Sequence, residues 1–100
     1  MKPKEISKII EKEINNDSSI TNWHNCDLEN CLIRPKKRKL WYADELKEFW
    51  IVLEENRETL KGFKIFFDEE SRKFGLAGWG EPFGYVCNLH DTFLAAFRSM

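Results

Sequence analysis

Cysteine and histidine are the residue types in this 100-residue sequence with the widest chemical repertoire. Cys26 and Cys31 lie near His24, and Cys87 precedes His90 by three positions. Thiolate and imidazole are ligands that zinc prefers, but a structural zinc site usually draws on two closely spaced pairs. Cys26 and Cys31 are five positions apart. We therefore predict no metal site and no cofactor, and we interpret the three cysteines as small buried hydrophobic residues.

Cys87 and His90 could instead serve as nucleophile and base, because both would lie near the end of one strand. A catalytic cysteine needs a lowered thiol pKa and an oxyanion-binding group, and the sequence indicates neither. Cys87 also alternates with Phe83 and Tyr85, on the side of the strand that we expect to face the core. The pattern predicts a protein that is not an enzyme.

Carboxylates occur in two groups, Glu54-Glu55 and Asp68-Glu69-Glu70. Neighbouring residues of a strand point to opposite faces, so Glu54 and Glu55 are not expected to share an acid–base site. The other three fall in a predicted turn, where we expect water to solvate them. Neither group predicts general acid–base catalysis.

The basic run Lys36, Lys37, Arg38 and Lys39 lies between two apolar segments. We interpret this run, residues 36–39, as the solvated turn of a hairpin. It also resembles a nuclear-import signal, in which extended basic residues fit an acidic groove. A third interpretation is a phosphate-binding patch with Trp41 and Tyr42 as stacking surfaces for bases. Residues 44–100 carry seven basic and eleven acidic residues, so nucleic acid is the alternative and not the expected partner.

A glycine-flanked tryptophan, Trp79, is predicted to lie at the tip of a turn. An exposed aromatic residue there would anchor a protein interface, unless the loop folds back and buries it. The predicted topology brings acidic residues to the same end of the sheet, and this first candidate surface comprises Trp79, Glu81, Glu54, Glu55 and Glu58. The opposite end offers a second candidate surface, or simply a solvated turn and a helix cap, at Asp68, Glu69, Glu70 and Asp91.

Short apolar runs with a two-residue period must position these side chains. They span residues 62–68, 73–77 and 83–88, separated by links of about four to six residues. Such links are too short for a parallel crossover, which predicts antiparallel pairing. Asp91 is a candidate cap for a final helix with an apolar face.

The preceding residues predict one more helix and further strands. A stripe of isoleucines predicts a helix over residues 3–15. We expect short strands at 31–34 and 40–42, a helical turn or loop at 44–47, and a strand at 48–54. The sequence therefore predicts one α+β domain over residues 1–100. In it, an N-terminal and a C-terminal helix pack on one face of an antiparallel β-meander of about four to six strands.

Composition narrows the class of protein further. The hydrophobic fraction of 42% is enough for a core without a metal or a disulfide. No apolar run approaches the roughly 20 residues of a membrane span. Three cysteines without framework spacing predict free thiols in a reducing compartment. We expect a cytoplasmic protein that does not enter a membrane.

Segments 50–55, 62–70, 74–77 and 92–94 together resemble small bacterial immunity proteins encoded beside polymorphic or contact-dependent toxins. The resemblance covers about half of the chain and consists of a meander, acidic turns, an aromatic-rich sheet and a terminal helix. It implies a cytoplasmic, non-enzymatic protein that binds one cognate toxin domain, often a basic nuclease, and blocks its active site. The two candidate surfaces are the expected contacts with that toxin, because acidic residues complement a basic partner.

Overall fold

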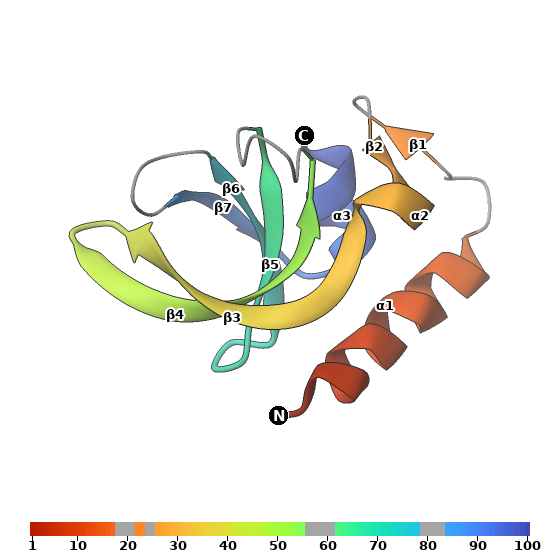
Figure 1. Cartoon of the computed structure of the whole chain (residues 1–100), viewed down its shortest axis with the longest axis horizontal. Coiled ribbons are helices and arrows are strands. Elements are labelled where there is room, and N and C mark those ends of the chain that lie inside the picture. Colours follow the sequence, from red (N-terminus) through yellow and green to blue (C-terminus); the bar gives the residue numbers. More distant parts are fainter. Residues whose placement is uncertain (18–21, 24–25, 56–61, 79–83) are drawn as a thin grey trace.

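The computed structural model describes residues 1–17, 22–23, 26–55, 62–78 and 84–100 as a strongly curved sheet with helices beside it (Figure 1). The helices are α1 (Pro3–Asn16), α2 (Leu28–Cys31) and α3 (Phe93–Arg98). The strands are β1 (Asn22–Trp23), β2 (Cys26–Asp27), β3 (Leu32–Tyr42), β4 (Glu45–Glu54), β5 (Lys64–Asp68), β6 (Lys73–Gly78) and β7 (Tyr85–His90). No helix among the described residues is long and apolar enough to cross a membrane.

Strands β3 to β7 form a small closed barrel in which neighbouring strands are consecutive in sequence. Each consecutive pair is antiparallel. The barrel closes where β3 and β7 meet in parallel, at the pair Trp41 and Tyr85. Strands β1 and β2 form a separate two-stranded ribbon. The predicted α+β meander with a helix near each end of the chain is therefore confirmed, and its closure into a barrel is an additional finding.

The hairpin of β3 and β4 corrects the predicted local structure. Residues 36–39 are not a turn but the middle of the eleven-residue strand β3. The turn lies at Ala43 and Asp44, and Ala43 has a φ of 55°, in the left-handed region that tight hairpin turns use. Pro35 does not end the strand, because it lies where the register between Leu32 and Lys36 shifts and the ladder is already interrupted. The expected helical turn at 44–47 is instead the start of β4.

The other predicted elements lie where expected, within one or two residues at most ends. Helix α1 buries Ile6 and Ile10, as its stripe of isoleucines predicts. Asp91 does not cap α3, because the residue at the cap position is Thr92, whose side chain accepts a hydrogen bond from the Ala95 amide at 3.1 Å. The predicted turn at 78–82 and most of the one at 55–61 lie outside the described residues.

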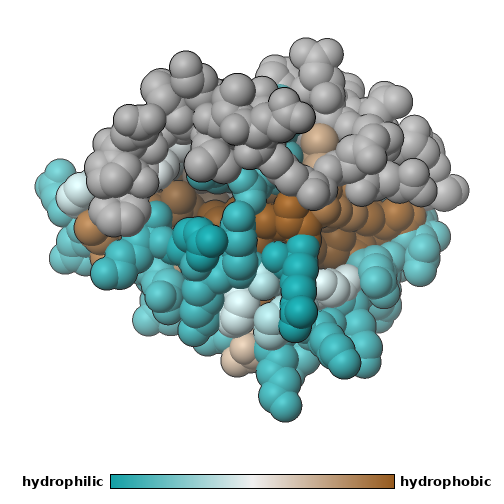
Figure 2. All heavy atoms as spheres, in the orientation of Figure 1, coloured by the Kyte–Doolittle hydropathy of each residue, from teal (hydrophilic) through white to brown (hydrophobic). Residues whose placement is uncertain are grey.

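The sheet buries both of its faces. On the outer face, Trp50, Val52, Phe67 and other apolar residues pack against α1 and α3. The inner face lines the barrel with Leu40, Phe49, Ile51, Phe66 and Ala77. Hydrophilic side chains cover the lower half of the molecule in the space-filling view, and a band of apolar atoms is visible above them (Figure 2). Some apolar surface therefore stays accessible on this side.

Glu13 joins the two helices of the outer face. Its carboxylate accepts hydrogen bonds from the backbone amides of Phe93 and Leu94, both at 3.0 Å. These amides begin α3 and have no acceptor within their own helix. A side chain of α1 therefore caps α3, which fixes how the two helices lie together on the sheet.

Replacing Glu13 with alanine is expected to lower the free energy of unfolding by about 2 kcal/mol, since two amides lose a charged acceptor. Glu11→Ala is the matched control, because Glu11 is exposed on the same helix, and we expect a change within about 0.5 kcal/mol. Urea unfolding followed by tryptophan fluorescence measures both values. Equal effects of the two substitutions would contradict the assigned role of Glu13.

Candidate partner-binding site

Three large apolar side chains form an exposed row across three neighbouring strands. Trp41 of β3 is paired with Leu46 of β4 on one side and with Tyr85 of β7 on the other. Directly paired residues project from the same face of a sheet, so the three side chains lie side by side. Their exposed fractions are 39%, 39% and 50%, respectively. A contiguous exposed apolar patch is a candidate binding surface.

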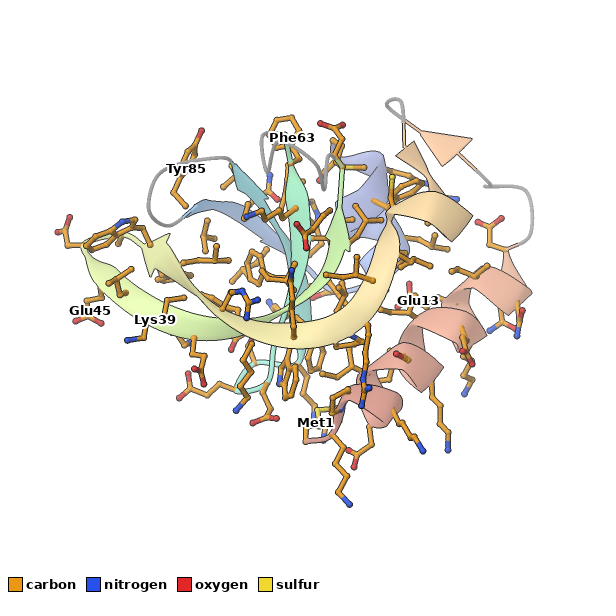
Figure 3. All side chains as sticks on the ribbon, viewed as in Figure 1. Met1, Glu13, Lys39, Glu45, Phe63 and Tyr85 are labelled. Carbon is orange, nitrogen blue, oxygen red and sulfur yellow. The ribbon has the colours of Figure 1, made fainter. Side chains whose placement is uncertain are left out.

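Backbone contacts at the barrel closure hold the exposed row in place. The Trp41 amide donates a hydrogen bond to the Gly84 carbonyl at 2.8 Å. The ring of Tyr85 lies against Gly78, where a Cβ atom would come within 2.5 Å of the ring. Tyr85 projects away from the body of the molecule (Figure 3). The sequence offered Trp41 as a stacking residue, whereas it placed Leu46 in a helical turn and Tyr85 on a core-facing side of its strand.

Tyr42 is also exposed, but it belongs to the opposite face of β3. Its ring centroid lies 6.3 Å from that of the buried Phe49. The Lys47 ammonium lies 5.7 Å from the Tyr42 ring centroid and 2.6 Å from a Glu70 carboxylate oxygen. The hydrogen bond to Glu70 raises the pKa of Lys47 above its ordinary value. Lys47 is therefore a charged residue held against the ring and the carboxylate.

The first candidate surface is only partly within the described residues. Trp79, Glu81 and Glu58 lie outside them. Glu54 is buried, with an exposed side-chain fraction of 4%, and its carboxylate lies 2.7 Å from the Lys36 ammonium. Glu55 is half-buried and accepts a hydrogen bond from the Phe63 amide at 3.3 Å. The structure thus gives Glu54 and Glu55 internal partners.

The residues of the second candidate surface differ in their burial and in their partners. Asp68 is buried, contrary to the expected solvated turn, and accepts a hydrogen bond from the Ser71 hydroxyl at 2.8 Å. Glu69 lies 2.8 Å from the amino group of Met1, and this contact lowers the pKa of Glu69. Glu70 binds Lys47, as described above. Asp91 is 89% exposed and lies 3.7 Å from the Lys73 ammonium.

The residues of the basic run in β3 also differ in their partners. Lys36 binds Glu54, and Lys37 lies 3.5 Å from Glu48 and over the Trp50 ring. Arg38 donates a hydrogen bond to the backbone carbonyl of Lys37. Neither Arg38 nor Lys39 has a carboxylate partner among the described residues, and Lys39 projects outward from the hairpin (Figure 3). Lys39, two positions before Trp41 on the same face of β3, is therefore a positive charge without a carboxylate partner in the described part of the chain.

The cysteines differ from the predicted buried thiols. Cys31 is buried and disulfide-bonded, so the expectation of free thiols throughout is wrong. Cys87 is a free, exposed thiol, because a register shift in the pairing of β6 with β7 leaves it without a directly paired residue. Partial burial of the sulfur raises the pKa of Cys87. This is the opposite of the change that activates a nucleophile.

His90 does not complete a catalytic or metal-binding group in the structure. Its Nε2 lies 2.8 Å from the side-chain oxygen of Asn88. His24 lies outside the described residues, as does the side chain of Cys26. Within the described part of the chain, no three histidine, cysteine, aspartate or glutamate residues are placed together to hold a metal ion.

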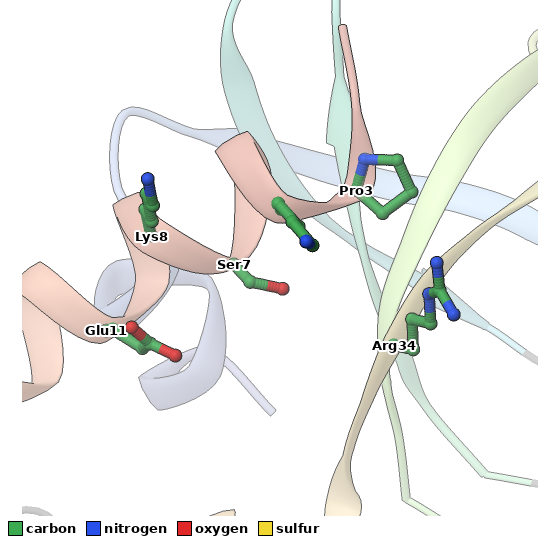
Figure 4. Close-up of a pocket in the computed structure, with 6 residues that line it drawn as sticks. Pro3, Ser7, Lys8, Glu11 and Arg34 are labelled. Atoms are coloured by element: carbon green, nitrogen blue, oxygen red, sulfur yellow. The ribbon is translucent and has the colours of Figure 1, made fainter.

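A groove of about 300 Å³ lies between α1 and β3, at the other end of β3 from the exposed row. Lys4, Ser7, Lys8 and Glu11 of the helix line it, together with Arg34 of the strand (Figure 4). A second groove that shares Ser7, Glu11 and Arg34 continues along the helix. These residues carry both positive and negative charges. Within the described part of the chain, no hydrogen bond or ion pair of their side chains assigns them a role.

Comparison with known proteins gave no relative. No protein-family model, no curated protein and no solved structure matches the chain.

Replacing Lys36 with methionine tests whether Glu54 is a structural residue. We expect a loss of about 2 kcal/mol in the free energy of unfolding, because a buried carboxylate loses its partner. The value falls below that of a fully buried pair because the Lys36 side chain is 39% exposed. Lys37→Met, the control for an exposed pair, should cost no more than about 1 kcal/mol. Thermal and urea unfolding measure both. A Lys36→Met protein as stable as the control would free Glu54 for a partner.

Proposed function

We propose that this protein is an immunity-type inhibitor that acts by binding a cognate toxin domain, and that the exposed row of Trp41, Leu46 and Tyr85 is the centre of its interface. The observation that carries the proposal is the row itself. Tryptophan and tyrosine dominate the binding energy of protein interfaces, and they do so from the centre of the contact. The resemblance to immunity proteins supplies the kind of partner.

The size and charge around the row are compatible with a protein partner. A standard interface uses about 800 Å² on each side, roughly one eighth of the 6327 Å² accessible surface of this chain. Asp44 lies in the turn beside the row, Glu45 follows it, and both are exposed. Glu45 projects from the hairpin into solvent (Figure 3). A basic toxin domain would meet these carboxylates at the rim, where they increase the association rate more than the affinity.

The proposal gives the protein no catalytic step. Binding over the active site of a toxin is sufficient for inhibition and needs only affinity and shape. Cys87 and His90 therefore have no chemical role in it. Acidic residues of the two candidate surfaces that are buried with internal partners stabilise the fold. Asp91, Glu69 and Glu70 remain candidates for contacts with the toxin.

Trp41→Ala is expected to weaken binding to the toxin encoded by the neighbouring gene by about 30-fold, which corresponds to the roughly 2 kcal/mol of a central aromatic anchor. Tyr85→Ala should have a similar effect. Trp41→Phe, the conservative control, should stay within about tenfold of the original affinity. Calorimetric titration of the purified pair measures these values. An adjacent gene product that does not bind, or a complex indifferent to all three substitutions, would refute the proposal.

A second candidate function, binding of single-stranded nucleic acid, is favoured by Lys39, which shares a face of β3 with Trp41, and by its neighbour Arg38. These two cations have no carboxylate partner in the described residues, and the tryptophan offers a stacking surface. The candidate predicts salt-dependent binding to a mixed 12-nucleotide DNA strand, with a log–log slope of about −0.7 for each phosphate contacted. Fluorescence anisotropy at low and moderate salt tests it, with Lys39→Ala and Lys12→Ala as the paired variants. No binding at low salt would exclude this function.

A further inference from the structure

Strand β7 has one edge that the barrel leaves almost unpaired. Along its other edge, β7 pairs with β6 from Gly78 and Tyr85 to Phe74 and His90. On the side toward β3, the described ladder consists of the single pair Trp41 and Tyr85. The edge from Val86 to His90 therefore extends beyond the closure without a neighbouring strand among the described residues.

A groove follows this edge. It measures about 290 Å³ and lies between the hairpin turn of β3 and β4 and the edge of β7. Its lining comprises Tyr42, Ala43, Val86, Cys87, Asn88 and Leu89. Val86 and Leu89 are only partly buried, although they pack on the inner core of the barrel. The groove thus gives an incoming side chain access to an apolar floor beside exposed backbone.

Few of the usual protections against strand pairing occur on β7. Edge strands commonly carry lysine, proline or a bulge that turns the backbone away. The six residues of β7 include neither lysine nor proline. The irregularity in its pairing with β6 leaves Cys87 unpaired but does not end the strand. An edge of this kind readily accepts an added strand from another chain.

The charges around the groove indicate which kind of strand would bind there. Its six lining residues include no charged side chain. Asp44 and Glu45 lie at its hairpin end and have no ion-pair partner among the described residues, whereas Asp91 follows β7 at the other end and lies 3.7 Å from the Lys73 ammonium. Lys47, whose ammonium lies over the Tyr42 ring, is bound to Glu70 and Asp68. The rim is therefore negative at its hairpin end, where it complements a basic segment.

We propose that an extended basic segment of the partner adds to the free edge of β7 as an extra strand and places an apolar side chain in the groove. This inference rests on the proposed partner binding and deepens it, because it names the chemistry of the bound segment. Tyr85 belongs both to the exposed row and to the start of the free edge. The row therefore adjoins the start of the added strand.

The test uses a blocked heptapeptide in which lysine alternates with valine, beginning and ending with lysine. We expect it to slow amide hydrogen exchange in residues 86–90 and to protect Cys87 from alkylation by N-ethylmaleimide, located by mass spectrometry. Two matched peptides carry N-methyl groups either on all lysine amides or on all valine amides. Each blocks one edge of the peptide strand, and one of them should bind at least about tenfold more weakly, because hydrogen bonds are lost.

Charge is tested separately from backbone pairing. A heptapeptide with glutamate in place of lysine should bind at least about tenfold more weakly. The variant carrying both Asp44→Lys and Glu45→Lys should weaken binding of the lysine peptide, whereas Glu11→Lys on α1 should not. Absence of peptide binding, equal binding of both methylated peptides, or protection elsewhere than β7 would overturn the inference. Dimerisation through the β7 edge in sedimentation experiments would assign the edge to a second copy and would also overturn it.

These outcomes are distinguishable from failure of the proposed function. A cognate complex that depends on Trp41 while residues 86–90 exchange freely would retain the function and remove the added strand. If the neighbouring gene product does not bind, the function falls, and the peptide experiments still decide the inference.

Discussion

The contact between β3 and β7 determines the shape of the whole sheet, because it closes the barrel. The Trp41 amide binds the Gly84 carbonyl at 2.8 Å, beside the one pair that closes the barrel. The approach is close, since a Cβ on Gly84 would lie 2.5 Å from the Gly78 carbonyl oxygen and 3.3 Å from the Leu40 side chain. A larger residue would separate the strands and open the inner core. The same contact is short, and so the edge of β7 from Val86 to His90 has no paired strand on this side among the described residues.

Charge is organised by the β3–β4 hairpin and its neighbours. The sequence divides into a basic first part and an acidic second part, yet the fold places lysines from the first beside carboxylates from the second. The closest of these pairs join adjacent strands, and they are Lys36–Glu54 at 2.7 Å and Lys37–Glu48 at 3.5 Å. Some of the acidic residues that suggested a surface for a basic partner therefore form ion pairs within the protein. Among the described residues, charges without an ion-pair partner include Asp44 and Glu45 at the hairpin, Lys39 beside it, and Lys4, Lys8 and Arg34 at the other end of β3.

The sequence could predict the parts of this fold that depend on local period. Alternation and short links were sufficient for β5, β6 and β7, and the isoleucine stripe was sufficient for α1. The length of β3 could not be predicted, because four consecutive charged residues indicate a turn unless a neighbouring strand supplies carboxylates for them. Ala43 carries no turn signal, although it adopts a positive φ. Cys87 was placed in the core because strict alternation does not allow for the register shift that exposes it. The exposed row depends on long-range pairing and was therefore only visible in the structure.

The length of the hairpin is compatible with the partner binding that we propose. Strands β3 and β4 have eleven and ten residues, whereas β5 has five and the inner core needs β4 only from Phe49 onward. Ordering each further residue costs about 1–2 kcal/mol of backbone entropy, which burial of apolar side chains normally offsets. At the hairpin tip, Trp41 and Leu46 remain 39% exposed, so this offset is incomplete within the chain. A partner that covers the row would complete the burial. The tip is thus ordered in advance, and binding need not include the entropic cost of forming it.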